Sequence, residues 1–273
     1  MTTFQAIVYA AVYGFSLFIP VGETAHMWAI STLLEWPTVQ DGLMGPLSLG
    51  ACLAVLIYFR HDWASIVSSC LRVTLLWKKP MTLDERMPLF LLLANLPMIV
   101  LLLTIRQMQI ELPSPENWSP FWVAGSLALL CVPVWLADRL NRRTKNMLSW
   151  NWVDALVVGF AQCVSLLPGG GRQIGAFAGG LFRNYSRESC AKFTFLTFGP
   201  VLLVQTLLEL RSTSVSGIST LTFSMAVAVS FLCGLMAIGS LMKQIQNKGL
   251  AGALFYRCLF AAVILGWFWM KNR

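Results

Sequence analysis

The residues best suited to chemistry lie at two interruptions of otherwise apolar sequence. The first follows Pro20 and contains Glu23 and His26; the second follows Pro168 and contains three glycines and Arg172. Proline removes a backbone donor and glycine releases the chain from helical geometry. Broken helices that carry charge at membrane depth are tolerated where they are buried in protein or line a wet cavity. We therefore interpret the two interruptions as halves of one anion-binding site.

In the second interruption, the residue types suit a phosphate or a carboxylate. Arg172 offers five donors in a planar fork and stays charged. Gly169, Gly170 and Gly171 allow backbone amides to approach an anion, and a helix that starts near Gln173 would present its positive end. The alternative interpretation is that Arg172 caps the carbonyls of a neighbouring broken helix.

In the first interruption, Glu23 and His26 are three residues apart, so a helix would place them on one face, opposite Arg172. The helix dipole favours a carboxylate in the first turn. Glu23 could then act as a base, orient His26 or hold a metal ion, and His26 could act as acid, base or nucleophile. The polar neighbour Thr24 is expected to bind the substrate together with the glycines and Gln173. Alternatively, a buried Glu–His hydrogen bond only stabilises the loop.

The composition identifies an integral membrane protein. Hydrophobic residues make up 57% of the 273 residues and charged residues 12%, about half of what soluble domains carry. The seven cysteines form no C-x-x-C pair and lie mostly in apolar runs, which favours packing over disulfides or metal binding. The net charge of +8 is better explained by loop asymmetry than by nucleic-acid binding.

The hydropathy pattern predicts an all-α polytopic membrane protein, a single membrane domain covering residues 1–273. Two broken re-entrant helix pairs are expected at residues 3–36 and 152–182. A basic amphipathic connection should follow the first span. Paired interruptions of this kind indicate two repeats, 1–138 and 139–273, of inverted topology. The six predicted full-length spans are residues 43–59, 88–105, 120–136, 193–209, 219–241 and 250–270.

Lysine and arginine in the loops predict the orientation. Four loops on one side carry 14 of these residues and the opposite side carries four, which places the first group in the cytoplasm and both termini outside. Among weaker signals, Gln162 could bridge the repeats or satisfy a backbone carbonyl. Arg257 in the last span could neutralise a carboxylate or reach the cavity, although a structural role is favoured for both residues.

Both interruptions resemble motifs of the BacA/UppP family of undecaprenyl-pyrophosphate phosphatases. Residues 13–26 read YGFSLFIPVGETAH, similar to the family pattern EGxxEFLPVSSTGH. Residues 168–175 read PGGGRQIG, similar to PGxSRSG. The resemblance extends over nearly the whole chain and includes Tyr256 and Arg257 in the last span. It implies the same all-helical fold with inverted repeats.

The chain departs from the family motifs at several positions. The two motif glutamates, which the resemblance connects with catalysis and divalent-cation use, align with Tyr13 and Leu17. The two motif serines align with Gly22 and Glu23, which closes a serine-nucleophile route. The serines flanking the family's arginine are also replaced, by Gly171 and Gln173, whereas the motif histidine and arginine remain at His26 and Arg172. Glu23 is then the carboxylate that returns a negative charge to the cavity.

The resemblance implies hydrolysis of a polyprenyl (undecaprenyl) pyrophosphate to the monophosphate, which would recycle carrier lipid for cell-envelope synthesis. It further implies a divalent cation, Mg²⁺ or Ca²⁺, with Glu23 as its candidate ligand, and a place in the bacterial inner (cytoplasmic) membrane. Two alternatives stay open: a non-hydrolytic polyprenyl-phosphate carrier or flippase, and a catalytically silent homologue. The sequence leaves open whether the protein forms a homo-oligomer.

Overall fold

The computed structural model describes residues 1–39, 42–76, 79–111, 113–212, 218–271 and 273. Within them, the regular secondary structure is helical, apart from one isolated bridge between Lys145 and Tyr185. The elements of the first half are α1 (Thr3–Phe18), α2 (Glu23–Leu33), α3 (Met44–Tyr58), α4 (Arg60–Leu75), α5 (Leu83–Gln107), η1 (Pro115–Asn117), α6 (Pro120–Leu129) and α7 (Cys131–Leu140). Those of the second half are η2 (Met147–Ser149), α8 (Trp152–Gln162), η3 (Cys163–Leu166), α9 (Arg172–Phe182), α10 (Arg187–Ser212), α11 (Thr220–Lys248) and α12 (Ala251–Lys271).

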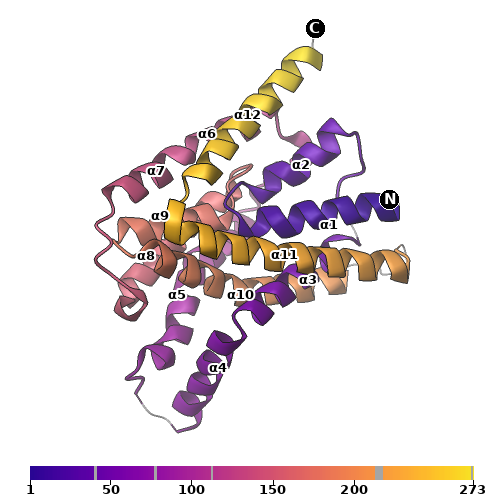
Figure 1. Cartoon of the computed structure of the whole chain (residues 1–273). Coiled ribbons are helices and arrows are strands. Elements are labelled where there is room, and N and C mark those ends of the chain that lie inside the picture. Colours follow the sequence, from indigo (N-terminus) through magenta and orange to yellow (C-terminus); the bar gives the residue numbers. More distant parts are fainter. Residues whose placement is uncertain (40–41, 77–78, 112, 213–217, 272) are drawn as a thin grey trace.

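The predicted class of fold is confirmed. Within the described residues, five spans are long and apolar enough to cross a membrane, with α6 and α7 forming one of them, and the count rises to six if the bent pair α3–α4 is one span. The predicted basic connection after the first span is α4, which turns by 82° from α3 and projects from the bundle beside the beginning of α5 (Figure 1). Residues 77–78 of this connection lie outside the described residues.

Local sequence explains where the re-entrant helices begin and end. α1 starts with a capping box of Thr2 and Gln5 and stops shortly before Pro20, and α8 starts where the Asn151 side chain accepts from the amide of Asp154. At 16 and 11 residues, α1 and α8 are shorter than the ~20 residues that a crossing requires. Each re-entrant pair therefore turns back inside the protein, as the sequence predicts.

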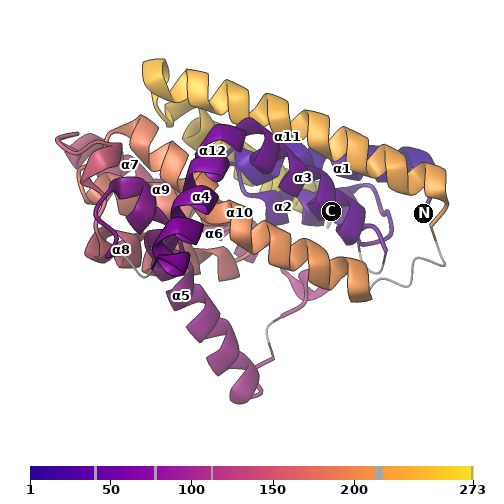
Figure 2. The ribbon, with the colours of Figure 1, turned by 90° about the horizontal axis from the view of Figure 1, so that it is seen from below.

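The two halves are packed into each other. α1 lies along α11, and α8 packs against α5, so each re-entrant pair rests on a long span of the other half (Figures 1 and 2). α3 contacts α10, and α6 contacts α12, which also join the halves. Gln162 illustrates the connection, because its side-chain amide donates to the carbonyl of Ala94 in α5 at 3.0 Å. This arrangement brings the two interruptions together in the interior.

A buried carboxylate anchors the second re-entrant pair at the end where α8 begins and α9 ends, away from the interruption. Asp154 is fully buried, and its Oδ2 accepts from Lys145 Nζ at 2.9 Å and from Tyr185 Oη at 2.6 Å. Arg183 donates to the other carboxylate oxygen, Oδ1. Burial, together with the hydrogen bond to Asp154, raises the pKa of Tyr185 well above its ordinary value. The cluster fixes the entry to α8 and the exit from α9.

Candidate functional site

The two interruptions meet backbone to backbone. α2 begins at Glu23 and α9 at Arg172, each directly after a glycine of positive φ, 93° at Gly22 and 67° at Gly171. A Cβ atom on Gly22 would lie 2.8 Å from the carbonyl oxygen of Gly169, and one on Gly171 would lie 3.9 Å from the Cα atom of Gly22. Only glycine allows this approach, so the first residues of the two re-entrant helices become neighbours.

A cavity of ≈ 220 Å³ opens where the two helices begin, and both halves of the chain contribute to it. Its polar lining consists of Tyr13, Glu23, Thr24, Ser165, Arg172, Gln173 and Gln205. Its apolar wall consists of Leu17, Met98, Leu102, Leu166, Phe198 and Leu202. The structure thus brings together Glu23, Thr24, Arg172 and Gln173, which are 150 residues apart at their extremes.

The charge of this cavity suits an anion. Glu23 and Arg172 each occupy the first position of a helix and act on one another electrostatically. Each helix start contributes about +0.5 of an elementary charge. Arg172 adds a positive charge and Glu23 a negative one, so the sum is about +1. Within the described residues neither side chain forms an ion pair, which leaves both available to a ligand.

A further donor lies beside Arg172. The side-chain nitrogen Nε2 of Gln173 is buried and has no hydrogen-bond partner within the described residues. Because buried polar atoms are nearly always paired, an orphaned donor in a cavity indicates a missing partner. Gln173 therefore fits the predicted role of holding an anion.

Two of the three glycine amides do not serve the cavity, which corrects the sequence prediction. The amide of Gly169 donates to Thr24 Oγ1 at 2.9 Å, and that of Gly170 donates to the carbonyl of Leu167 at 2.8 Å. Of the three, only Gly171 lines the cavity. Gly169 and Thr24 instead fasten the two loops together, and Gly170 closes a turn within the second loop, because a loop buried between helices must satisfy its own backbone groups.

His26 does not face Arg172, so the expectation that it shares a space with Glu23 is wrong. Its Nδ1 lies 2.7 Å from the carbonyl oxygen of Gly22 and its Nε2 lies 2.8 Å from Tyr256 Oη. The ring also stacks on Phe260, with centroids 4.2 Å apart. Two residues three apart diverge by about 60° around a helix, and this divergence is enough to direct His26 toward α12.

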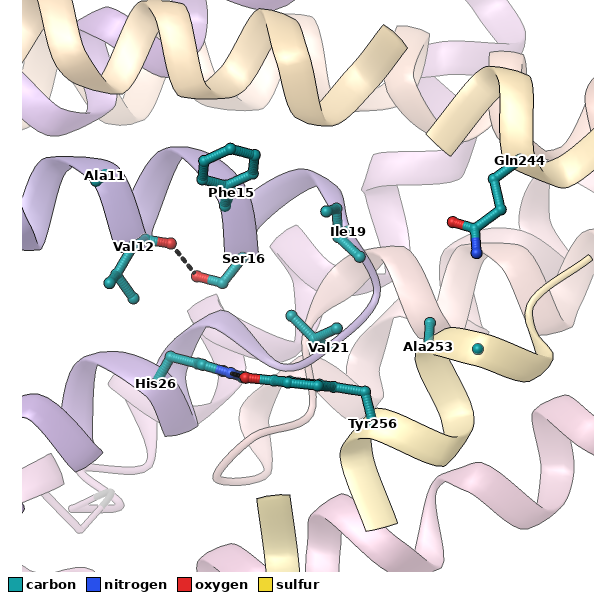
Figure 3. Close-up of a pocket in the computed structure, with 11 residues that line it drawn as sticks. Ala11, Val12, Phe15, Ser16, Ile19, Val21, His26, Gln244, Ala253 and Tyr256 are labelled. Carbon is teal, nitrogen blue, oxygen red and sulfur yellow. Dashed lines mark hydrogen bonds between the residues drawn. The ribbon is translucent and has the colours of Figure 1, made fainter. Parts of the chain in front are cut away.

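The His26 ring borders a second space. This groove has a volume of ≈ 490 Å³ and lies between α1, α2, α11 and α12, as Figure 3 shows for His26, Phe15, Gln244 and Tyr256. Because a carbonyl can only accept, Nδ1 carries the proton toward Gly22, and Nε2 is engaged by the tyrosine hydroxyl. Both ring nitrogens are therefore occupied by the protein.

Three polar residues of the cavity are not among the sequence predictions. Tyr13 enters only as the replacement of a motif glutamate, and Ser165 and Gln205 are not singled out. Gln205 lies inside the apolar run of α10, so its polarity at membrane depth is the signal that could have identified it. Arg257, in contrast, lines neither cavity, because its side chain is buried against backbone carbonyls, as the favoured structural role requires.

Comparison with known proteins identifies the family of the chain. The family model described as bacitracin resistance protein BacA matches residues 6–263. Undecaprenyl-diphosphatase from Chlorobium phaeobacteroides (strain DSM 266) is 30% identical over 276 residues, covering 97% of this chain and 96% of the relative. Undecaprenyl-diphosphatase from Moorella thermoacetica is 29% identical over 273 residues and covers all of both chains. The chain is a multi-pass membrane protein and belongs to the bacitracin resistance protein BacA family.

Proposed function

We propose that this protein is a membrane phosphatase that hydrolyses a polyprenyl pyrophosphate, such as undecaprenyl pyrophosphate, to the monophosphate and inorganic phosphate. The activity would recycle carrier lipid for cell-envelope synthesis at the outer face of the bacterial cytoplasmic membrane. The observation that carries the proposal is the convergence of Glu23 and Arg172, one from each re-entrant pair, on one cavity of positive character. The names of the relatives support the choice of substrate.

In this proposal Arg172 and Gln173 bind the pyrophosphate. The guanidinium fork and the first amides of α9 stabilise the charge that develops on the phosphate oxygens as the bond to the bridging oxygen breaks. Glu23 accepts the proton of the water molecule that attacks the terminal phosphorus. His26, whose ring nitrogens are engaged by Gly22 and Tyr256, keeps the first loop in place and takes no part in the transfer.

A divalent cation fits this cavity only when the phosphates of the substrate supply most of its ligands. Within the described residues there is no group of three His, Cys, Asp or Glu side chains that could hold a metal ion. Mg²⁺ is commonly bound by one or two carboxylates together with substrate phosphates. Glu23, which lines the cavity, would supply that carboxylate. When bound, the cation would neutralise charge on the phosphate oxygens.

The size of the cavity limits what enters it. At ≈ 220 Å³ it is smaller than the pockets of about 300–1,000 Å³ that enclose drug-sized ligands. It has room for the pyrophosphate head and the beginning of the chain, which Met98, Leu102 and Phe198 would contact. The remainder of the isoprenoid would lie in the bilayer.

The second candidate function is a non-hydrolytic carrier of the same lipid. Two observations favour it: each re-entrant pair packs on the other half, as in transporters with inverted repeats, and no histidine lies in the cavity. A carrier would hold the lipid pyrophosphate without breaking a bond.

One experiment separates the two functions. Phosphate release from a C15 or C55 pyrophosphate is measured with purified protein, with and without Mg²⁺ or Ca²⁺, beside lipid binding. We expect Glu23→Gln to lose about 10²-fold or more of the turnover and to keep binding. Arg172→Ala should weaken binding most, because it removes both the charge and the guanidinium fork. Arg172→Lys should weaken binding less, because lysine loses the fork but retains the charge. Arg139→Met, a change at an exposed arginine on α7, is the control.

The outcome that contradicts the phosphatase is equally definite. In a carrier there is no turnover to lose, and Glu23→Gln should bind the lipid more tightly, because a like charge beside the phosphate is removed. Absence of metal-dependent phosphate release by the parent protein, combined with tighter binding by Glu23→Gln, would identify the carrier.

A further inference from the structure

Arg257 is a buried cation without a carboxylate. Its side chain, in the first half of α12, is 0% exposed, and within the described residues it forms no ion pair. A buried charge inside a membrane protein is costly, and residues that carry one usually have a function. Its donors are directed at backbone carbonyls, with Nε 3.2 Å from the oxygen of Leu127 and Nη2 3.0 Å from that of Gly169.

Gly169 is the point where both loops are fastened. Its carbonyl accepts from Arg257, and its amide donates across the interface to Thr24 Oγ1. Nη1 of Arg257 is buried without a partner in the described chain and lies 3.2 Å from the place that a Cβ on Gly22 would take. The guanidinium therefore fills the junction between the first loop and the second.

Tyr256, which precedes Arg257 in α12, is linked to the first loop through His26. Tyr256 Oη contacts His26 Nε2, and Figure 3 shows these two side chains beside each other. His26 Nδ1 in turn is bonded to the carbonyl of Gly22. Two consecutive residues of α12 thus act on the loops: Tyr256 is linked to the first through His26, and Arg257 hydrogen-bonds the second while its Nη1 packs against Gly22 of the first. Neither lies in the cavity that contains Glu23 and Arg172.

We propose that Arg257 is a positioning residue, which holds the two re-entrant loops in register and thereby sets the separation of Glu23 and Arg172. Arginine suits the task because its planar fork serves two carbonyls at once and does not lose its charge. The consequence for turnover rests on the proposed phosphatase function. The consequence for the loops does not.

The test uses purified full-length protein and the variants Arg257→Gln and Arg257→Lys, with Arg139→Met as the control. Amide hydrogen exchange followed by mass spectrometry reports on the loops at residues 20–24 and 166–172. We expect exchange in both loops of Arg257→Gln to accelerate about tenfold or more, the effect of losing a charge-assisted hydrogen bond. Its kcat should fall about 10²-fold, as expected when reacting groups shift by about 1 Å. Arg257→Lys should change both quantities less.

Tyr256→Phe provides a second, milder variant. It removes one hydroxyl and should accelerate exchange at residues 20–24 while residues 166–172 keep the exchange of the parent. If Arg257→Gln and Arg257→Lys fail to fold, the exchange rates of the two loops in Tyr256→Phe test the proposal alone. Equal acceleration of both loops in Tyr256→Phe contradicts the proposal.

Two further results would overturn it. One is that Arg257→Gln shows the same amide exchange in the loops and the same kcat as the parent protein. The other is faster exchange spread evenly over α5 and α11 as well as the loops, which would mean that Arg257 serves general stability. If the parent protein releases no phosphate, the proposed function fails, and the exchange data still decide the role of Arg257.

Discussion

Replacing Gly22 by alanine tests whether the two loops meet as described. The residue has a φ of 93°, a conformation that costs an L-residue about 1–2 kcal/mol. The added methyl group would lie 2.8 Å from Gly169 O, 2.8 Å from Leu127 Cδ2 and 3.2 Å from Arg257 Nη1. Overpacking of this kind costs about 1–3 kcal/mol, and the stiffer unfolded chain returns about 0.4–1 kcal/mol. We expect Gly22→Ala to lower the free energy of unfolding by about 2–4 kcal/mol.

The assay is reversible unfolding in mixed micelles with an increasing fraction of sodium dodecyl sulfate, followed by circular dichroism. Gly125→Ala in α6 is the matched control, because a Cβ at that helical position meets nothing within 4 Å. This variant should be unchanged or more stable by up to about 1 kcal/mol. If Gly22→Ala is as stable as Gly125→Ala, the close contact between the loops does not exist.

Two other predictions concern the ends of the bundle. Asp154→Asn should lower the free energy of unfolding by about 2–3 kcal/mol in the same assay, since Lys145 and Arg183 would face a neutral amide. Asp62→Asn, which breaks a partly exposed pair with Lys192, should lower the free energy of unfolding by less than about 1 kcal/mol. If the two variants lose the same stability, Asp154 does not anchor the second re-entrant pair. A cysteine at the exposed position of Arg142 should resist an impermeant thiol reagent in intact cells and react in inverted vesicles. Labelling in intact cells, beyond that of the parent, would reverse the orientation.

Much of the fold could be predicted because its signals are local. Long apolar runs mark the spans, and Pro20 and Pro168 mark the points at which two of these runs turn back. The bend after α3 was predicted only as the start of a basic connection. Its angle of 82° depends on contacts between α4 and residues distant in sequence. Asp62 pairs with Lys192, and the Trp63 ring packs against Gly199.

Within the site, the correct predictions are those that depend on backbone breaks. Glycine before Glu23 and before Arg172 indicated that two helices start there, and the structure places both starts at one cavity. The direction of His26 could not be predicted, because it is decided by Tyr256, 230 residues away. In the same way, the amide of Gly169 is taken by Thr24, 145 residues away. Spacing along a helix does not contain this information.

The position of Glu23 gives a physical reason for the altered motifs. The resemblance aligns the family's two glutamates with Tyr13 and Leu17, and both of these residues line the cavity that Glu23 also lines. Compared with that motif, this chain carries its carboxylate at the first residue of α2 instead of in the interior of α1, and there the helix dipole stabilises it by about 0.3–1 kcal/mol. One carboxylate in place of two leaves the cavity about one unit more positive. Such a cavity holds a pyrophosphate with less help from a cation, so the proposed reaction should depend less on divalent metal than one catalysed with both glutamates.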